Sequence, residues 1–571
     1  MGDGLKKWIS YNKDYSNIDN FVKEFEISET LARLLINRNI DSIEKAESYL
    51  NPDISQLHNP FEMFDMSKSL NRIEKAILEK EKICIYGDYD VDGITSVAML
   101  YSLIKKLKGN AIYYIPDRLE EGYGLNSEAI KKIKDLDVKL IITVDCGIRS
   151  VDEVNLANDL NIDVIITDHH ECSDILPAAY SIINPNQKQC KYPFKDLAGA
   201  GIVFKIITAL SEKLLLKDYA LEFLDLTALA TVADVVTLTG ENRVIVQKGI
   251  EQAKKTTNRG LKALINVCDI ELTDLNTYHL GFIIAPRINA AGRLKHANIV
   301  VELLTTKDDA RAYEIAKMLN ELNYNRQQIE NNMLETALKK IKNEMDLKEE
   351  HVIVLDDSSW HVGVVGIIAS RITEKFNKPS IIISIENEIG KGSARSINGL
   401  NICETLSACK ELLVKYGGHE LAAGLTIEKR LIKDFREKIN AIVHKFKKDK
   451  PFYHEILVDY KLDNKINLVN IYNEIQKLEP FGAGNPKPLF VYRFLILKEV
   501  KTVGLDGKHL SLKMFNGKEY LSGIGFNMGF VANHIEVNRK VDIICSVEMN
   551  TWNGEENIQL HIKDLKISKY K

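Results

Sequence analysis

Short apolar runs alternating with helical patterns constrain the fold of this 571-residue chain more than any other feature. Four such runs follow one another from about Lys82, namely KICIYG, NAIYYIP, KLIITV and DVIIT. Helical patterns at 94–107, 127–134 and 150–160 separate them. Apolar strands bounded by such helices predict a parallel sheet that is covered on both faces. Each run ends in a loop with acidic or histidine residues, and functional loops of parallel sheets lie at these strand ends.

The rest of the chain divides into further segments, because one core stops growing at roughly 250–300 residues. A mostly helical stretch runs from about 303 to 345, and a second α/β pattern begins at HVIVLDD. After Pro451, short strands with Gly/Asn turns are typical of a small all-β barrel. We therefore expect an N-terminal segment (1–80), a first α/β domain (81–240), a helical part with a connecting helix (241–345), a second α/β domain (346–450) and a β-barrel domain (451–571).

Composition indicates an ordinary globular protein and leaves nucleic-acid binding open. Hydrophobic residues make up 45% and charged residues 27% of the chain, and the formal charge is −4. No apolar run approaches the ~20 residues of a membrane span, and the N-terminus lacks a signal-peptide core, so we expect a cytoplasmic protein without membrane attachment. Eight scattered cysteines without a C-x-x-C pair argue against a disulfide framework and against structural zinc. The stretch 428–450 carries nine Lys/Arg against four Asp/Glu and is either a solvated helix face or part of a DNA path.

Three carboxylates stand at alternate positions in the loop GDYDVDG: Asp88, Asp90 and Asp92. In an extended segment these side chains point the same way, and their convergence requires a balancing cation. The spacing also fits a calcium-binding EF-hand loop. That interpretation fails because Met99 stands where a bidentate Glu is needed and the preceding segment is strand-like.

Later loops supply ligands of the same kind. They are Asp145 in TVDCG, Asp168, His169 and His170 in TDHH, and Asp234 in the apolar stretch ALATVADVV. Carboxylates with imidazoles and no thiolate favour Mn²⁺ or Mg²⁺ over zinc. The number of carboxylates suits two ions about 3.5–4 Å apart, an arrangement that hydrolyses phosphoryl bonds. The alternative is that these residues only cap helices and form turns, but their grouping at successive strand ends favours the metal site.

The motifs TDHH, GDYDVDG and VDCG together resemble the DHH phosphoesterase superfamily, and GGHELAAG (417–424) is similar to the motif of its second domain, DHHA1. Further segments resemble the bacterial RecJ branch of single-strand-specific 5′→3′ DNA exonucleases: APRINAAGR, WHVGVVGIIASR, GSARS and LEPFGAGNPKPLF. The resemblance covers about 82 to the C-terminus. It implies an α/β, two-lobed DHH/DHHA1 core with parallel sheets joined by a long helix, followed by a C-terminal OB-fold barrel.

The resemblance also implies roles for the metal-centre residues. One ion would be held by Asp92, Asp145, His169 and Asp234, and a second would lie near Asp88 and Asp90 with Asp145 as the bridge. Related inorganic pyrophosphatases carry a histidine where this chain has Tyr86, so the ligand set of one ion stays open, with Asp88 as a candidate replacement. The expected catalytic residues are Asp168, His170 and His419. His419 would contact the scissile phosphate, and is also a candidate proton donor, or would instead be a core histidine in a tight turn.

Four residues match positions that bind the 5′-terminal phosphate in the family: Arg118, Arg293, Ser393 and Arg395. The planar fork of arginine pairs with two phosphate oxygens, although each residue could instead be a structural ion-pair partner. Arg287, Asn289, His361 and Arg371 lie in matched motifs with roles left open. In the barrel, Phe481, Phe490, Tyr492 and Lys508 are candidates for single-strand binding by stacking and charge, with Phe481 and Phe490 as possible core residues.

The implied activity is a Mn²⁺- or Mg²⁺-dependent, two-metal exonuclease that releases 5′-mononucleotides from 5′ ends of single-stranded DNA, in repair and recombination. Expected partners of this monomer are a single-strand-binding protein and a RecQ-type helicase. One alternative is a DHH phosphodiesterase of short oligonucleotides or nucleotide second messengers, which usually lacks the barrel. Another is a non-catalytic single-strand-binding scaffold, which would lack metal ligands. A dinucleotide-binding oxidoreductase is disfavoured because no G-x-G-x-x-G follows the first strand.

Overall fold

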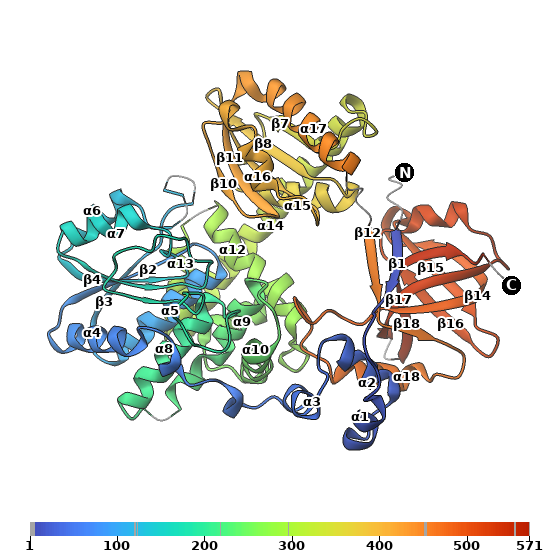
Figure 1. Cartoon of the computed structure of the whole chain (residues 1–571), viewed down its shortest axis with the longest axis horizontal. Coiled ribbons are helices and arrows are strands. Elements are labelled where there is room, and N and C mark those ends of the chain that lie inside the picture. The colour runs from blue at the N-terminus through green and yellow to red at the C-terminus, as the bar shows by residue number, and fades with distance from the viewer. Residues whose placement is uncertain are drawn as a thin grey trace. The chain divides into compact units, whose positions relative to one another are not determined.

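The computed structural model describes residues 6–118, 121–122, 124–216, 218–294, 296–449, 454–552 and 555–569. The chain forms two compact units (Figure 1). Unit 1 comprises His58–Asp234 and Lys248–His454, and unit 2 comprises Lys6–Leu57, Val235–Gln247 and Glu455–Lys571. Unit 2 is therefore assembled from three separate stretches of the sequence.

The first sheet of unit 1 has five strands, and every neighbouring pair is parallel. In spatial order the strands are β3 (Asn110–Tyr114), β2 (Lys82–Gly87), β4 (Val138–Val144), β5 (Asp163–Thr167) and β6 (Ser181–Ile183). β4, with the sequence VKLIITV, is buried at every position except its second. This continuous burial confirms the predicted parallel sheet with two covered faces.

Helices cover both faces of this sheet. They are α4 (Met66–Leu78), α5 (Val91–Lys106), α6 (Ser127–Asp135), α7 (Val151–Asp159), α8 (Gly199–Lys213) and α9 (Leu224–Ala233). Helices α6 and α7 share one buried cluster with residues of β2, β4 and β5, whereas α5 packs on β2, β3 and β4 and against α8 and α9. Asp90 caps α5 by accepting the Gly93 N–H, so the helix begins at Val91, earlier than the predicted start at Ile94.

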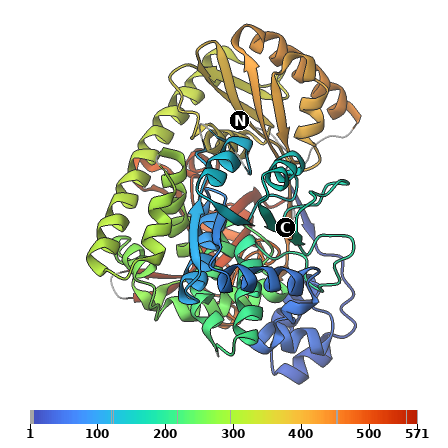
Figure 2. The ribbon, with the colours of Figure 1, turned by 90° about the vertical axis from the view of Figure 1, so that its left-hand side faces the viewer.

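A helical part leads from the first lobe of unit 1 to its second lobe (Figure 2). It contains the end of α10 (Gly240–Ala253), a helix that begins in unit 2, followed by α11 (Arg259–Val267), a π-helix (His279–Ile284), α12 (Ala285–Leu294), α13 (Asn298–Thr305) and α14 (Asp309–Glu344). Helix α14 is 36 residues long, and Asp308 caps its N-terminus by accepting the amides of Ala310 and Arg311. It supplies the predicted long connecting helix.

The second sheet of unit 1 is mixed. Its order is β10 (Lys415–Gly418), β11 (Ala422–Glu428), β9 (Ile389–Arg395), β8 (Ser380–Glu386) and β7 (Ile353–Asp357). Strands β7 and β8 pair in parallel and the other neighbours pair antiparallel. Helix α15 (Val365–Phe376) shares a core with α14, and α16 (Ile402–Ser407) and α17 (Ile432–Asp449) belong to a second core.

Unit 2 contains a closed five-stranded barrel. Strands β14 (Phe490–Val503), β15 (His509–Phe515), β16 (Tyr520–Gly525), β18 (Glu555–Ile567) and β17 (Lys540–Trp552) follow in order, and β17 pairs again with β14. Strand β13 (Tyr460–Leu462) adds to β14, and β1 (Lys6–Ser10) pairs with β12 (His454–Val458). Helices α1 (Ile18–Phe25), α2 (Glu29–Asn37), α3 (Ile43–Leu50) and α18 (Leu468–Gln476) share one core with the barrel. The closed barrel confirms the predicted OB fold.

No helix among the described residues is both long and apolar enough to cross a lipid bilayer.

Candidate active site

The acidic loops of the first sheet lie next to one another because the strands before them end in register. Gly87 pairs with Val144, and Val144 pairs with Thr167. Asp88, Asp145 and Asp168 each follow one of these strand ends. The backbone continues the pairing, since the Asp145 N–H donates to Thr167 O at 3.0 Å and the Asp168 N–H to Ile183 O at 3.1 Å. The structure therefore gathers these three carboxylates at one edge of the sheet, as the sequence predicts.

Asp92 reaches the same edge by a different route from the predicted one. The loop is not extended through Asp92, because α5 has already begun and Asp92 lies in its first turn. Its carboxylate accepts the backbone N–H groups of Gly199 at 2.6 Å and Ala200 at 2.8 Å, at the N-terminus of α8. Helix N-termini favour such negative charge. The expectation of an extended segment was therefore wrong for Asp92, although the predicted convergence is present.

Asp234 comes from a helix end and not from a strand end. The apolar stretch around it forms α9, and Asp234 is the C-cap residue of that helix. Val235 follows with φ +61°, which is an outlier for a β-branched residue and marks a strained turn. Asp234 Oδ2 lies 3.5 Å from His169 Nε2.

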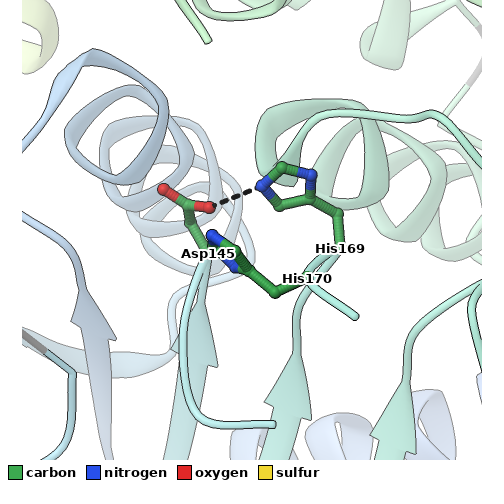
Figure 3. A group of neighbouring side chains, drawn as sticks. All are labelled: Asp145, His169 and His170. Atoms are coloured by element: carbon green, nitrogen blue, oxygen red, sulfur yellow. Dashed lines mark ion pairs between the residues drawn. The ribbon is translucent and has the colours of Figure 1, made fainter. Parts of the chain in front are cut away.

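His169 lies between the carboxylates. Its Nε2 atom is 3.1 Å from Asp145 Oδ1 and 4.0 Å from Asp92 Oδ2, and Figure 3 shows the ring pointing at Asp145. Ligand atoms lie within 4.8 Å of one another in three groups: Asp145, His169 and His170; Asp92, His169 and Asp234; and Asp88, Asp90 and Asp145. All six predicted ligands thus fall into overlapping groups, with Asp145 in two of them.

The charges in these groups require a cation. Burial, followed by the charge of Asp90, raises the pKa of Asp88 well above its ordinary value and that of Asp92 to about 7. Burial, followed by the charge of Asp92, raises the pKa of Asp234 to about 9. Such shifts mean that crowded, buried carboxylates are costly to ionise without a positive partner.

The orphaned atoms of the cluster fit a divalent ion. Among the described residues, Asp88 Oδ1, His169 Nε2 and Asp234 Oδ2 are buried and have no hydrogen-bond partner. Burial, followed by the charge of His170, lowers the pKa of His169 to about 4, so its imidazole is neutral and has a free lone pair. Carboxylate oxygens with one imidazole and no thiolate suit Mn²⁺ or Mg²⁺. The donor set therefore fits the two-ion centre that the sequence predicts.

Asp168 belongs to none of the three groups of ligand atoms found among the described residues, and it organises the loop that carries the two histidines. Its Oδ1 atom accepts His170 Nδ1 at 2.6 Å and the backbone N–H of His169 at 2.8 Å, and its Oδ2 atom accepts the Ile148 N–H at 3.0 Å. Burial alone would raise the pKa of Asp168, but these hydrogen bonds hold it below its ordinary value. Burial alone would lower the pKa of His170, and Asp168 raises it above its ordinary value.

Three supporting residues were missed by the sequence interpretation. Asn186 Nδ2 donates to His169 O at 2.7 Å, and Asn184 Nδ2 donates to His170 O at 2.9 Å. Both asparagines therefore hold the loop that carries these two histidines, the histidine loop, in place. Gly199 lies so close to the cluster that a Cβ atom there would be 2.8 Å from Asp145 Cβ. Asn184 follows β6 directly and Asn186 stands two residues later, so the rule that strand ends carry function could have found them.

Tyr86 takes no part in the cluster. Its side chain is fully buried, stacks on Tyr114 with ring centroids 5.4 Å apart, and donates its hydroxyl to Gly124 O at 2.9 Å. It therefore occupies the core beneath the sheet, on the side of α6 and α7.

His419 of the second lobe follows β10 and is exposed. Its N–H donates to Ala422 O at 2.8 Å. Burial, followed by the positive charges of Arg149 and His170, lowers the pKa of His419, so this side chain lies within electrostatic range of the first lobe's histidine loop. The alternative of a core histidine is wrong because the residue is exposed.

All four residues predicted to bind a terminal phosphate line one cavity of about 540 Å³ in unit 1. They are Arg118, Arg293, Ser393 and Arg395. Arg395 Nη1 donates to Ser393 Oγ at 2.9 Å, and Arg293 Nη1 donates to Gly363 O at 2.9 Å. Burial, followed by the charges of Arg118, Arg326 and Arg395, lowers the pKa of Arg293 to about 10. The arginines therefore repel one another, which an anion would relieve.

The N-terminus of α15 forms another wall of this cavity, through Val365, Gly366 and Ile367. A Cβ atom at Gly366 would lie 3.2 Å from Ser393 Oγ and 3.3 Å from Arg395 Nη2, so glycine keeps this wall open. Backbone N–H groups at a helix N-terminus bind phosphate, which suits the same ligand as the arginines.

The other residues of the matched motifs have structural contacts. Arg287 donates to Ile283 O at 2.5 Å and to Asn320 Oδ1 at 2.9 Å, and Asn289 is half-buried in α12. His361 Nδ1 accepts the Gly363 N–H at 3.1 Å. Arg371 pairs with the buried Glu330 of α14.

Two of the aromatic residues considered for strand binding lie in the barrel core, which confirms the core alternative for Phe490 and contradicts the binding role expected of Tyr492. Phe490 and Tyr492 are buried in the barrel core, where their rings cannot stack on a base. Phe481 packs partly buried against the same core, and Lys508 is exposed.

The basic stretch 428–450 carries mostly paired charges where its side chains are described. Its ion pairs join Lys429 to Glu388, Arg430 to Glu428, Arg436 to Asp356 and Lys438 to Glu411. This pairing favours the solvated helix face over a DNA path.

Comparison with known proteins gives the family. The models of the DHH family N-terminal domain, the DHHA1 domain and the RecJ OB domain match residues 82–231, 349–445 and 458–564. The chain is 37% identical over 99% of its length to the single-stranded-DNA-specific exonuclease RecJ of Bacillus subtilis, covering 71% of that protein. It is 33% identical to RecJ of Haemophilus influenzae, over 93% of this chain and 95% of the relative.

Solved structures agree. RecJ in complex with Mn²⁺ from Thermus thermophilus is 28% identical, with a TM-score of 0.86 over 100% of this chain and 81% of that one. The exonuclease RecJ bound to manganese is 33% identical, with a TM-score of 0.61 over 69% of this chain and 97% of that one. Matches of this coverage, with the DHH, DHHA1 and OB domains in this order, show that the chain belongs to the RecJ family of single-stranded-DNA-specific exonucleases.

Proposed function

We propose that the chain degrades single-stranded DNA from its 5′ end and releases 5′-mononucleotides with two divalent cations, Mn²⁺ or Mg²⁺. The observation that carries this proposal is the presence, in unit 1, of a carboxylate–histidine cluster and a separate arginine-lined cavity. A terminal phosphate monoester carries more negative charge than an internal phosphodiester. A cavity with several uncompensated arginines therefore selects a strand end, while the cluster provides the hydrolytic centre.

The residues of the cluster would hold the ions in two overlapping sets. Asp92, Asp145, His169 and Asp234 would bind one ion, and Asp88 and Asp90 would bind the other, with Asp145 shared. When bound, such ions activate water and neutralise charge on the phosphoryl oxygens. Asp92 is held in place by the amides of α8, so its carboxylate is oriented before any ion arrives.

His170 and His419 would act on the substrate from two lobes. Asp168 accepts His170 Nδ1 and favours the protonated ring, whose positive charge would attract a phosphate oxygen. His419 is exposed and within electrostatic range of His170, so it would contact the scissile phosphate from the second lobe.

The terminal phosphate would bind Arg118, Arg293, Ser393 and Arg395. Arg118 also stacks on Tyr89, with its guanidinium carbon 4.8 Å from the ring centroid, in the loop between Asp88 and Asp90. This contact links the phosphate cavity to the metal centre. It supports a defined spacing between the bound end and the bond that is cut.

The OB barrel would bind the strand beyond the cleaved bond. A role in DNA repair and recombination, a single-strand-binding protein and a RecQ-type helicase as partners, the monomeric state and the cytoplasmic location all stay predictions.

The decisive experiment uses a long single strand labelled at its 3′ end, with Mn²⁺, beside a blunt duplex of equal sequence. We expect progressive shortening of the labelled strand, release of mononucleotides and a spared duplex. Cleavage of only di- to pentanucleotides would instead indicate a small-substrate phosphodiesterase, and binding without shortening would indicate a scaffold. The Asp145→Ala variant should bind the strand and shorten none of it.

A further inference from the structure

The phosphate cavity is larger than one phosphate group requires. Its volume is about 540 Å³, whereas a water molecule takes up roughly 30 Å³ and cavities of ~300–1,000 Å³ hold whole small-molecule ligands. A phosphate group has only a few non-hydrogen atoms. The four residues assigned to the terminal phosphate therefore leave part of the cavity for additional ligand.

Further polar residues line the remaining part. Lys391, Ser393 and Arg395 lie at alternate positions of β9, so their side chains leave the same face of the sheet. Lys391 lies about 6.6 Å along the strand from Ser393. Ser370 and Arg371 line the cavity from α15.

Lys391 is exposed, and within the described ranges it forms no ion pair and donates no side-chain hydrogen bond. Arg371, in contrast, already pairs with Glu330. Lys391 is thus the cation of this part of the cavity that is available to a ligand.

The net positive charge of the residues that line the cavity exceeds the negative charge of a monophosphate. Five basic residues line it, and the described lining contains one carboxylate, Glu374. Even with the charge of Arg371 set against Glu330, three arginines and a lysine face a single exposed glutamate. A 5′-monophosphate, at about two negative charges, leaves this excess uncompensated, and a longer chain of phosphates would balance it.

We propose that this cavity accepts 5′-diphosphate and 5′-triphosphate ends of single strands, with the added phosphates bound by Lys391. The inference rests on the proposed function, because it places the first phosphate on Arg118, Arg293, Ser393 and Arg395.

The reaction on such an end is the same hydrolysis with a different product. Water adds its oxygen to the phosphorus between the first and second nucleotides, and the bond from that phosphorus to the 3′ oxygen breaks. The 3′ oxygen leaves with a proton. The released product is a nucleoside 5′-triphosphate, and the remaining strand carries an ordinary 5′-monophosphate.

The test compares three DNA strands of one sequence that carry a 5′-triphosphate, a 5′-monophosphate or a 5′-hydroxyl, with the full-length protein and Mn²⁺. Products of the first turnover are separated by anion exchange. We expect intact nucleoside triphosphate from the first strand, at a rate within about tenfold of mononucleotide release from the second.

Lys391→Ala should lower the ratio of triphosphate to monophosphate use about tenfold, equivalent to ~1.4 kcal/mol. Lys415→Ala, at an exposed lysine of β10 that does not line the cavity, is the matched control and should leave the ratio unchanged. An equal ratio in the Lys391→Ala and wild-type proteins would overturn the assignment of Lys391.

The outcomes also separate this inference from the proposed function. If the monophosphate strand is degraded but the triphosphate strand releases no nucleoside triphosphate, the inference is wrong and the proposed function stands. This holds even if free nucleoside triphosphate inhibits the enzyme. No shortening of any of the three strands overturns the proposed function.

Discussion

Gly199 donates its backbone N–H to Asp92 Oδ2 at 2.6 Å. A side chain at position 199 would crowd the carboxylate that accepts this hydrogen bond. A Cβ atom there would lie 3.0 Å from the same oxygen and 2.8 Å from Asp145 Cβ. The N-terminus of α8 thus serves as a support for the metal centre, and its glycine allows the close approach.

Gly199→Ala should therefore disrupt the metal centre without unfolding the protein. We expect Mn²⁺ affinity to fall about 10–100-fold, the range seen when supporting contacts of metal ligands are lost. Isothermal titration with Mn²⁺ measures this directly. Gly201→Ala is the control, because the three atoms nearest to a Cβ atom there all belong to the side chain of Leu197, at 3.2 Å or more, and none to the metal centre. Equal Mn²⁺ affinities in both variants would argue against the support role.

Asp145→Asn should stabilise the metal-free protein and abolish its stabilisation by Mn²⁺. Burial, followed by the charge of Asp92, raises the pKa of Asp145 well above its ordinary value. The folded-state pKa of Asp145 thus exceeds the unfolded value of about 3.9. The contribution of Asp145 to the free energy of unfolding therefore falls as the pH rises above that unfolded value. At pH 7.5 the metal-free variant should melt roughly 2–4 °C higher. Wild-type protein should gain Tm on addition of Mn²⁺ and the variant should not.

Asp168→Asn should slow the reaction more than it weakens metal binding. Asp168 contacts His170 and three backbone amides and lies in none of the metal-binding groups found among the described residues. We expect kcat to fall about 10–100-fold, with Mn²⁺ affinity within a few-fold of wild type. A variant that loses Mn²⁺ binding to the same degree as Asp145→Ala would make Asp168 part of the metal centre.

Arg395→Ala should weaken the use of 5′-phosphorylated ends more than that of 5′-hydroxyl ends. The guanidinium donates to Ser393 Oγ and lines the cavity, so its loss removes a charge-assisted contact worth ~1.5–3 kcal/mol. The ratio of kcat/KM for the two ends should fall at least tenfold. Arg430→Ala, at an exposed arginine paired with Glu428, is the control. An equal loss on both ends would remove Arg395 from the terminal-phosphate site.

The sequence predicted the metal cluster because parallel strands that end in register bring their following residues together. That rule places Asp88, Asp145 and Asp168 without any knowledge of long-range packing. It could not place Asp234, because α9 is mostly apolar and is buried along most of its length. A buried helix and a buried strand share that pattern.

For the barrel, the sequence predicted the fold but not which aromatic side chains point into its core. The closed barrel follows from short strands with Gly/Asn turns, yet the facing of each side chain depends on register. β14 contains bulges against β15 and against β17, which shift the alternation that a sequence pattern assumes. Tyr492 consequently lies inside the barrel, and its hydroxyl accepts Asn516 Nδ2 at 2.8 Å.

The segment LEPFGAGNPKPLF, which helped to identify the family, has a structural role in unit 2. Asn485 is buried, donates to Leu478 O at 2.7 Å and to Pro480 O at 2.8 Å, and accepts the Tyr49 hydroxyl at 2.9 Å. Arg243 adds to this joint by donating to Tyr49 O and Leu478 O, each at 3.0 Å. Three separate stretches of the chain therefore meet at one hydrogen-bonded joint.

Arg243→Met should destabilise unit 2 and leave the metal centre of unit 1 intact. Arg243 is 2% exposed and its guanidinium carbon lies 3.6 Å from the centroid of the Tyr49 ring, so the substitution leaves buried carbonyl groups with fewer donors. Each such loss costs about 1–3 kcal/mol. We expect calorimetry to show a lower-temperature transition, with Mn²⁺ affinity as in wild type. Arg539→Met removes only an exposed ion pair with Glu536 and should cost about 0–1 kcal/mol. If the two variants melt alike, the three stretches of unit 2 do not depend on this joint.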